Sequence, residues 1–205
     1  HGHLNWQVPV MLVAHSCVCS WWRAVKGEAA PDEDWRRYRQ QVAKGCRQTD
    51  LVVAPSQAML AALLAEHGNC QQAQVIYNGR DFPEERPWEQ WCRQKEPVCF
   101  SAGRLWDEAK NIAALAKVAP DLSWSLILAG EPDETTDLTT VEFRGHLDAR
   151  EMAEQLRRAA IYVMPAKDEP FGLSILAAAR SGCTLVLGDI PSLREIWGDA
   201  ACFVN

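Results

Sequence analysis

Short apolar runs alternate with helix-length amphipathic segments along most of this chain. The runs predict buried strands at residues 8–13, 51–54, 74–77, 98–102, 125–129, 141–144, 161–164, 185–187 and 202–204. The segments between them predict helices at residues 32–44, 56–66, 111–119, 148–159, 173–179 and 191–197. Regular strand–helix alternation is typical of a parallel, doubly wound α/β sheet, which is the fold class we expect.

Local signals at the helix ends support this interpretation. Ser56 precedes the second helical segment and Gly68 follows it, as an N-cap and a helix stop do. Asp148 and Glu151 have the spacing of a capping box. These residues fix where two of the helices begin.

The interval 78–97 divides the alternation into two parts. It is rich in Pro, Glu, Arg and Trp and lacks periodicity, so we interpret it as a linker between residues 1–77 and residues 98–205. The first part supplies only three predicted strands, which is thin for an α/β layer. The chain also opens without methionine and stops on a strand. We therefore expect a fragment whose first domain is incomplete and exposes apolar surface on its sheet.

Composition excludes several classes of protein. The 205 residues are 48% hydrophobic with a net charge of -6, which argues against a nucleic-acid partner. No apolar run approaches the roughly 20 residues of a membrane span, and the first ten residues lack the apolar stretch of a signal peptide. We expect a cytoplasmic protein.

The eight cysteines show no C-x-x-C spacing. Cys99, Cys183 and Cys202 lie within apolar runs, so reduced, buried thiols are expected. A zinc site would need closer grouping of cysteine with histidine, and the sequence analysis therefore predicts no metal site.

The first candidate for chemistry is the segment SAGRLWDEAKN, residues 101–111. A strand ends there, Gly103 frees the backbone, and Arg104 and Lys110 follow. Ligands bind at the carboxyl ends of strands in open α/β sheets, so these cations could hold a diphosphate. Solvated surface side chains are the alternative.

The second candidate is the segment from Glu169 to Gly198. Glu169 lies just ahead of Phe171, Gly172 and a helix, which places a carboxylate beside backbone N–H groups that attract anions. A nucleotide sugar, with hydroxyls next to phosphates, suits that pairing.

Together, EPFGLSIL, SGCTLVLGDIPSLRE and GRL with the following Lys-Asn pair resemble the donor-binding signature of retaining GT-B glycosyltransferases of family 4. The resemblance implies two Rossmann-like domains that face a cleft. It assigns Arg104 and Lys110 to the diphosphate and Glu169 to the hydroxyls of the donor sugar. Further residues whose backbone would approach sugar and phosphate are Gly103, Phe171, Gly172, Leu173 and Ser174.

One signature residue is absent. The family's second glutamate, which holds the ribose, would fall at position 177, which is Ala177. The departure implies weaker ribose binding, a substitute residue or an inactive member. On this basis Ala177→Glu is expected to tighten donor binding.

The resemblance adds two weaker candidates. His15 follows the first strand and would reach across the cleft toward the donor sugar, although a structural histidine is an equal alternative. Gly145, in the turn FRGHLD, would lie near the nucleobase through backbone contacts.

The resulting hypothesis is a retaining, metal-independent glycosyltransferase without a cofactor, with Glu169 and His15 as catalytic residues. Its donor is a nucleotide-diphosphate sugar, and its acceptor is an unidentified carbohydrate or lipid-linked molecule. The alternatives are a degenerate nucleotide-sugar-binding module and a nucleotide-sugar epimerase. The basic amphipathic helix beginning near Trp35 is interpreted as core packing, with peripheral contact to a membrane surface as a second possibility.

Overall fold

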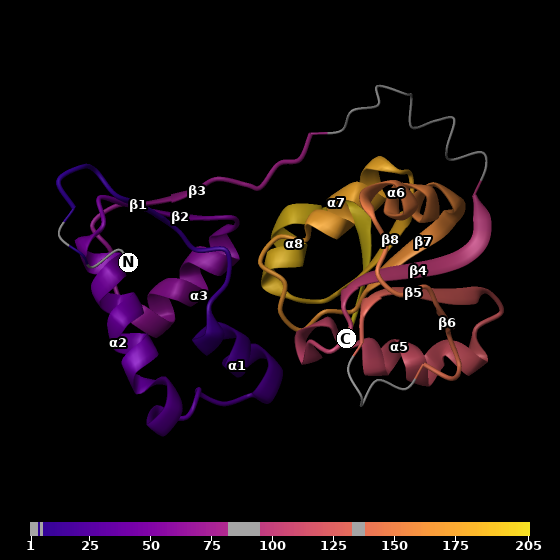
Figure 1. Ribbon diagram of the computed structural model, residues 1–205, viewed down its shortest axis with the longest axis horizontal. Helices are drawn as coiled ribbons and strands as arrows, with labels where there is room; N and C mark the ends of the chain where they lie inside the picture. The colour runs from indigo at the N-terminus through magenta and orange to yellow at the C-terminus, as the bar shows by residue number, and fades with distance from the viewer. Residues whose placement is uncertain (1–3, 5, 82–94, 133–137) are drawn as a thin grey trace.

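The computed structural model describes residues 4, 6–81, 95–132 and 138–205 and contains two parallel β-sheets (Figure 1). The smaller sheet has the order β1-β2-β3, with strands Met11–Val13, Leu51–Ala54 and Ala73–Val75. The larger has the order β6-β5-β4-β7-β8-β9. Its strands, in chain order, are Glu96–Arg104, Ser125–Glu131, Glu142–Phe143, Ala159–Met164, Thr184–Gly188 and Ala201–Val204. The predicted α/β class with two parallel sheets is confirmed.

Helices connect the strands as the alternation predicts. The first sheet carries α1, α2 and α3, at Val18–Lys26, Asp32–Gln48 and Gln57–His67. The second carries α5, α6, α7 and α8, at Ile112–Val118, Ala149–Arg158, Leu173–Arg180 and Pro191–Trp197. Short 3-10 turns lie at Glu108–Lys110, Ala119–Asp121 and Gly198–Ala200.

The predicted helix caps form. The Ser56 hydroxyl accepts a hydrogen bond from the Met59 amide, and Asp148 and Glu151 make the reciprocal capping box. Gly68 ends α3 with a positive φ of 80°. The local sequence therefore determines the start of α3 and α6 and the end of α3.

Strand order in the larger sheet creates a site for a ligand. If these six strands are numbered from 1 to 6 in chain order, they lie side by side in the order 3-2-1-4-5-6. This is the doubly wound Rossmann order. The chain returns from edge strand β6 to place β7 beside β4. The connections after β4 and β7 therefore leave in opposite directions, and the crevice at that switch point is where such sheets bind ligands.

Alternation along β4 builds a core on each face of the larger sheet. Phe100 packs with Tyr162, Ile175 and Leu187 on one face, and its neighbour Cys99 belongs to the cluster on the other. Figure 1 shows α6, α7 and α8 together on one side of the sheet and α5 on the opposite side.

The first sheet is small and only partly covered. Its core includes Val52, Met59 and Leu63, and Trp35 and Tyr38 of α2 pack against it, which supports the core interpretation of that helix. Other α2 residues on this core are Val42 and Cys46. Met11 and Val13 of edge strand β1 are exposed, so the sheet presents apolar surface, as expected.

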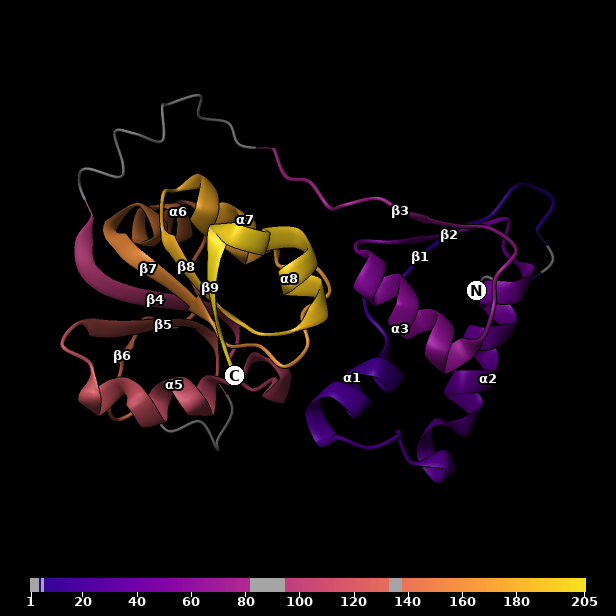
Figure 2. The ribbon, with the colours of Figure 1, turned by 180° about the vertical axis from the view of Figure 1, so that it is seen from behind.

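Contacts join the two sheets through α1, α3 and α8. The Trp21 indole donates to Asp107 (3.1 Å), and Lys26 pairs with Glu108 (2.6 Å). The Glu195 carboxylate of α8 accepts from the first amides of α3, those of Gln57 and Ala58. Both views show α3 on the side of the first sheet that faces α8 (Figure 2).

The structure departs from the expectations at several points. Helix α1 was not predicted: its N-cap is Cys17, which makes no side-chain cap, so the usual start signal is missing. Strand β1 begins at Met11 because the amide of the preceding Val10 donates to the Asp50 carboxylate. Cys202 is exposed, since it lies on edge strand β9.

The seven cysteines in the described ranges form no disulfides, and five of them are buried. Most of the predicted linker, residues 82–94, lies outside the described residues. No helix in the described ranges combines the length and apolar character needed to span a membrane.

Candidate functional site

A cavity of about 420 Å³ lies at the carboxyl ends of strands from both sheets. It is lined by every predicted site residue except Gly145: His15, Gly103, Arg104, Lys110, Glu169, Phe171, Gly172, Leu173 and Ser174. The remaining walls are Asn78, Ala102, Met152, Met164 and Pro170. His15 follows β1 and Asn78 follows β3, so the first sheet closes the cavity from the opposite side.

Lys110 and Glu169 form an ion pair inside this cavity. Lys110 Nζ lies 2.6 Å from Glu169 Oε2, and the side chains are only 12% and 15% exposed. The second carboxylate oxygen, Oε1, accepts from the Phe171 amide at 3.4 Å. The sequence motifs assign these two residues to adjacent parts of one ligand, but they do not predict the direct contact between Lys110 and Glu169.

Two hydrogen bonds hold the loops that carry the pair. The Asn111 side chain donates to the Pro165 carbonyl (3.1 Å), and the Lys167 amide donates to the Ala109 carbonyl (2.8 Å). Asp107 caps the 3-10 turn that ends at Lys110 by accepting from the Ala109 amide. The connections after β4 and β7 are thereby fixed to each other, although 59 positions separate Lys110 from Glu169.

Arg104 is the second cation of the cavity. One of its terminal nitrogens donates to Asp107 at 2.8 Å, and the guanidinium lies 5.4 Å from the centre of the Trp106 ring. The Arg104 side chain is 62% exposed, whereas Asp107 is 6% exposed. A guanidinium has five N–H donors, so the contact with Asp107 leaves capacity for an anionic ligand.

Helix α7 presents its N-terminus at the cavity wall. Gly172 occupies the N-cap position with φ of 90°, and no side chain caps the helix. This left-handed conformation favours glycine, and a Cβ here would also lie 2.5 Å from Ile175 Cδ1, which would have to move. The first amides of an α-helix lack intrahelical acceptors and carry partial positive charge, which favours an anion here.

Gly130 is a structural residue of the site that the sequence analysis missed. Its amide donates to the Gly145 carbonyl at 2.8 Å, and a Cβ added to it would lie 1.7 Å from the Gly103 carbonyl oxygen. Gly145 itself does not line the cavity but is connected to Gly103 through this glycine. The sequence carries a signal for Gly130: the segments SAG and LAG each place a glycine at the end of a strand, and these two strands are neighbours in the sheet.

Asp168 is a half-buried carboxyl next to the ion pair. Burial and, to a smaller extent, the charge of Glu169 raise the pKa of Asp168 to about 6, against the opposing effect of Lys110. The folded state therefore binds this proton more tightly than the unfolded chain does. Stability is expected to fall as pH rises through the window from about 4 to about 6.

Asp168→Asn is expected to raise the free energy of unfolding at pH 7.5 by on the order of 2 kcal/mol, because it removes the ionised carboxylate from this position. The gain should be smaller at pH 4.5, where the native Asp168 is protonated. Thermal unfolding at both pH values measures the difference. The exposed Asp121→Asn is the control, and an equal gain at both pH values would contradict the assignment.

A second cavity, of about 700 Å³, lies at the opposite edge of the first sheet. Trp6, Val10, Asp50 and Gln71 are among its lining residues, and they precede the strands instead of following them. Ligand sites in parallel α/β sheets lie at the carboxyl ends, so this cavity is not the candidate site.

Comparison with known proteins identifies the family of this chain. The family model described as glycosyl transferases group 1 matches residues 96–205, which is more than half of the chain. The chain belongs to the group 1 glycosyltransferases. This assignment confirms the resemblance that the donor-binding segment indicated.

Solved glycosyltransferases share the fold at low sequence identity. Sucrose-phosphate synthase from Thermosynechococcus elongatus superposes with a TM-score of 0.77 and 20% identity, covering 95% of this chain. The Anabaena HepE structure in complex with UDP and glucose gives 0.68 and 20%, covering 96% of this chain. Glycogen synthase of Mycobacterium tuberculosis is 45% identical over 58 residues, which is 28% of this chain.

The chain spans only part of these proteins. The matches cover 54% of the sucrose-phosphate synthase chain and 58% of the HepE chain. The aligned segment of glycogen synthase is 14% of that protein.

The position of Ala177 changes one expectation for this glycosyltransferase. Ala177 is 7% exposed, belongs to the core on the α7 face of the larger sheet, and does not line the cavity. A glutamate here would bury a carboxylate among apolar side chains. The expectation that Ala177→Glu tightens donor binding is therefore replaced by the following one.

Ala177→Glu is expected to lower the free energy of unfolding by about 3 kcal/mol, because it places a carboxylate among the apolar side chains of the core. For a chain of this size the loss corresponds to roughly 6–12 °C in the unfolding midpoint. Ala113→Glu, at an exposed position of α5, is the matched control. A stable Ala177→Glu variant with stronger nucleotide binding would restore the original expectation.

Proposed function

We propose that the chain binds a nucleotide-diphosphate sugar in the cavity between the two sheets and belongs to a retaining, metal-independent glycosyltransferase. The observation that carries the proposal is the buried Lys110–Glu169 pair, 2.6 Å apart, beside Arg104 and the N-terminus of α7. These groups combine fixed positive charge with a hydroxyl acceptor within one cavity. HepE, a structural neighbour, was solved in complex with UDP-glucose.

We place the donor in this cavity in one orientation. The diphosphate would lie against Arg104, Lys110 and the first amides of α7, which are its three sources of positive charge. A lysine ammonium has three donors, so Lys110 can keep its bond to Glu169 and also donate to a phosphate oxygen. Glu169 would accept from the hydroxyls of the sugar, because its carboxylate lies next to the cationic end.

Bond cleavage in this scheme depends on the leaving group. As the bond between the anomeric carbon and the diphosphate breaks, negative charge grows on the phosphate oxygens, and the two cations stabilise it. Within the described part of the chain, Glu169 is the single carboxylate of the cavity wall. A double displacement would use two carboxylates about 5 Å apart, so we favour acceptor attack from the face that the diphosphate leaves.

His15 approaches the donor from the first sheet. It lines the same cavity as Glu169 although 154 positions separate them in the sequence. We assign it to contact the donor sugar, with Asn78 beside it as a second polar group that the sequence analysis did not identify. Acceptor binding is assigned to the same side of the cleft.

Donor binding can be tested on the 205-residue chain itself by calorimetry with UDP-glucose, UDP and uridine. Since the cations hold the diphosphate, UDP should bind at least about tenfold more tightly than uridine, a difference of 1.4 kcal/mol. Other nucleoside diphosphates and their sugars identify the base. Equal binding of uridine and UDP would reject the diphosphate clamp.

Transfer is expected from the complete open reading frame and not from the 205 residues alone. These residues span only about half the length of the solved glycosyltransferases that they match. Turnover should survive EDTA, because Arg104, Lys110 and α7 neutralise the diphosphate without a metal. Loss of turnover that magnesium or manganese restores would overturn metal independence. A matched sample without chelator sets the reference rate.

A nucleotide-sugar-binding module without transfer is the second candidate. Ala177 favours it, since the family's second carboxylate is absent at this position. Both candidates predict binding of UDP-glucose or a similar donor. Release of free sugar or transfer to an acceptor by the complete open reading frame distinguishes them.

A further inference from the structure

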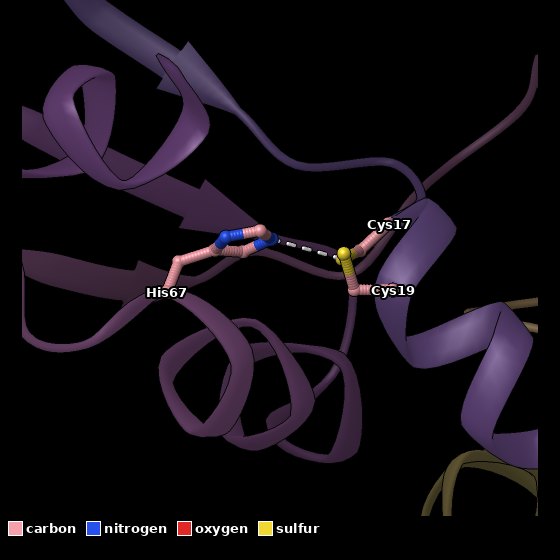
Figure 3. A group of neighbouring side chains, drawn as sticks. All are labelled: Cys17, Cys19 and His67. Carbon is pink, nitrogen blue, oxygen red and sulfur yellow. Dashed lines mark hydrogen bonds between the residues drawn. The ribbon is translucent and has the colours of Figure 1, made fainter. Parts of the chain in front are cut away.

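A buried group of two thiols and one imidazole lies in the first sheet's core, apart from the donor cavity. Cys17, Cys19 and His67 are 2%, 0% and 5% exposed, and their ligand atoms all lie within 4.8 Å of one another. Figure 3 shows the His67 ring facing the side chains of Cys17 and Cys19. The sequence analysis predicted no metal site, because 48 positions separate Cys19 from His67.

The distances fit a small thiophilic cation after a minor adjustment. Cys17 Sγ lies 3.2 Å from His67 Nε2. Zinc at about 2.3 Å from sulfur and about 2.0 Å from nitrogen would place a tetrahedral pair of ligands about 3.6 Å apart. For this pair the required movement is a few tenths of an ångström, and for a pair at the 4.8 Å limit it is about 1 Å, which rotation of the cysteine and histidine side chains can supply.

The charges favour a divalent ion. Two thiolates with one Zn²⁺ and a neutral imidazole form an uncharged group, which suits a buried site. A monovalent ion bound by the same two thiolates would instead leave a net negative charge in the core.

We propose that Cys17 Sγ, Cys19 Sγ and His67 Nε2 bind one zinc ion. Binding replaces the two S–H bonds with two Zn–S bonds and releases both protons to solvent, and it forms one Zn–N bond to the neutral ring. Three protein ligands leave the fourth coordination position to a water molecule. Tyr38 packs edge-on against His67, with ring centroids 6.0 Å apart.

The site would stabilise the part of the first sheet that touches the donor loop. Cys17 and Cys19 lie at the start of α1, and His67 is the last residue of α3. The same α1 helix donates from Trp21 to Asp107, which in turn holds Arg104. Zinc would thus connect α1 to α3 behind the cavity without contacting the donor, and the inference does not depend on the proposed function.

The test uses the reduced 205-residue chain with any histidine tag removed. After incubation with Zn²⁺ and gel filtration, we expect one zinc per chain by mass spectrometry of the metal content. Co²⁺ should give a thiolate-to-cobalt charge-transfer band that Zn²⁺ removes. Added Zn²⁺ should also raise the unfolding midpoint, since it binds the folded state preferentially.

Cys17→Ala, Cys19→Ala and His67→Gln should each weaken zinc binding at least about 100-fold, measured by competition with a chromophoric chelator. Cys46→Ala is the matched control, because Cys46 is equally buried in the same cluster but outside the triad. Absence of zinc in the reduced wild-type chain, or binding of Cu⁺ but not Zn²⁺, would overturn the proposal. If a variant fails to fold, the cobalt spectrum of the wild type decides: a spectrum without thiolate charge transfer rejects the site.

Discussion

Replacing Lys110 with alanine is expected to lower turnover of the complete enzyme by about 10²–10³-fold, because the variant loses a buried cation placed to stabilise the departing diphosphate. Lys110 is 12% exposed, so water cannot substitute fully for its charge. The same change leaves Glu169 without its partner at 2.6 Å. Donor affinity should therefore fall together with turnover, and calorimetry and steady-state rates measure the two effects.

Lys117→Ala is the matched control, since Lys117 is an exposed lysine on the neighbouring helix α5. The double variant Lys110→Ala with Glu169→Gln separates the ion pair from the contacts with the donor. If the losses of the two single variants simply add, the residues act independently on the ligand. A Lys110→Ala variant with normal turnover and unchanged UDP affinity would contradict the assignment of Lys110 to the diphosphate.

Zinc rescue distinguishes this chemistry from the metal site proposed in the first sheet. Loss of activity on chelation that only Zn²⁺ reverses, accompanied by a lower unfolding midpoint, would point to the Cys17, Cys19 and His67 group. Rescue by Mg²⁺ without a change in the unfolding midpoint would instead point to the donor cavity. The two proposals can therefore fail separately.

Most of the fold follows from local patterns in the sequence. Strand-length apolar runs and the caps at Ser56 and Asp148 predicted the elements, because burial of alternate residues and satisfaction of helix ends are local requirements. Helix α1 was missed because Cys17 supplies no capping side chain and the following WW pair suits either a helix or a core loop. At α1, contacts with residues that are distant in the sequence determine the structure.

The candidate site shows the same division. The cavity residues were found because the motifs place them at strand ends, which a parallel sheet brings to one edge. The Lys110–Glu169 contact and the triad of Cys17, Cys19 and His67 depend on how loops meet in space, and residue spacing carries no signal for either. The burial of Ala177 likewise depends on the packing of α7 on the sheet.

The second large effect is expected at Gly130, in the strand beside the donor loop. Gly130→Ala should disrupt the end of β4, because the new Cβ would lie 1.7 Å from the Gly103 carbonyl oxygen, a backbone atom that no rotamer change can move. Gly130 also has φ of 137°, which a side chain rarely adopts. We expect a loss of about 3 kcal/mol in unfolding free energy and of detectable UDP binding.

Gly79→Ala provides the control, since a Cβ at Gly79 meets no atom within 4 Å and its φ is not positive. The two substitutions add the same methyl group, so any difference between them arises from the backbone contact of Gly130 with Gly103. Gly103 precedes Arg104, and displacement of its carbonyl would move the guanidinium that is assigned to the diphosphate. A Gly130→Ala chain with native stability and native UDP affinity would show that the end of β4 can shift without loss, and the donor loop would then not depend on this glycine.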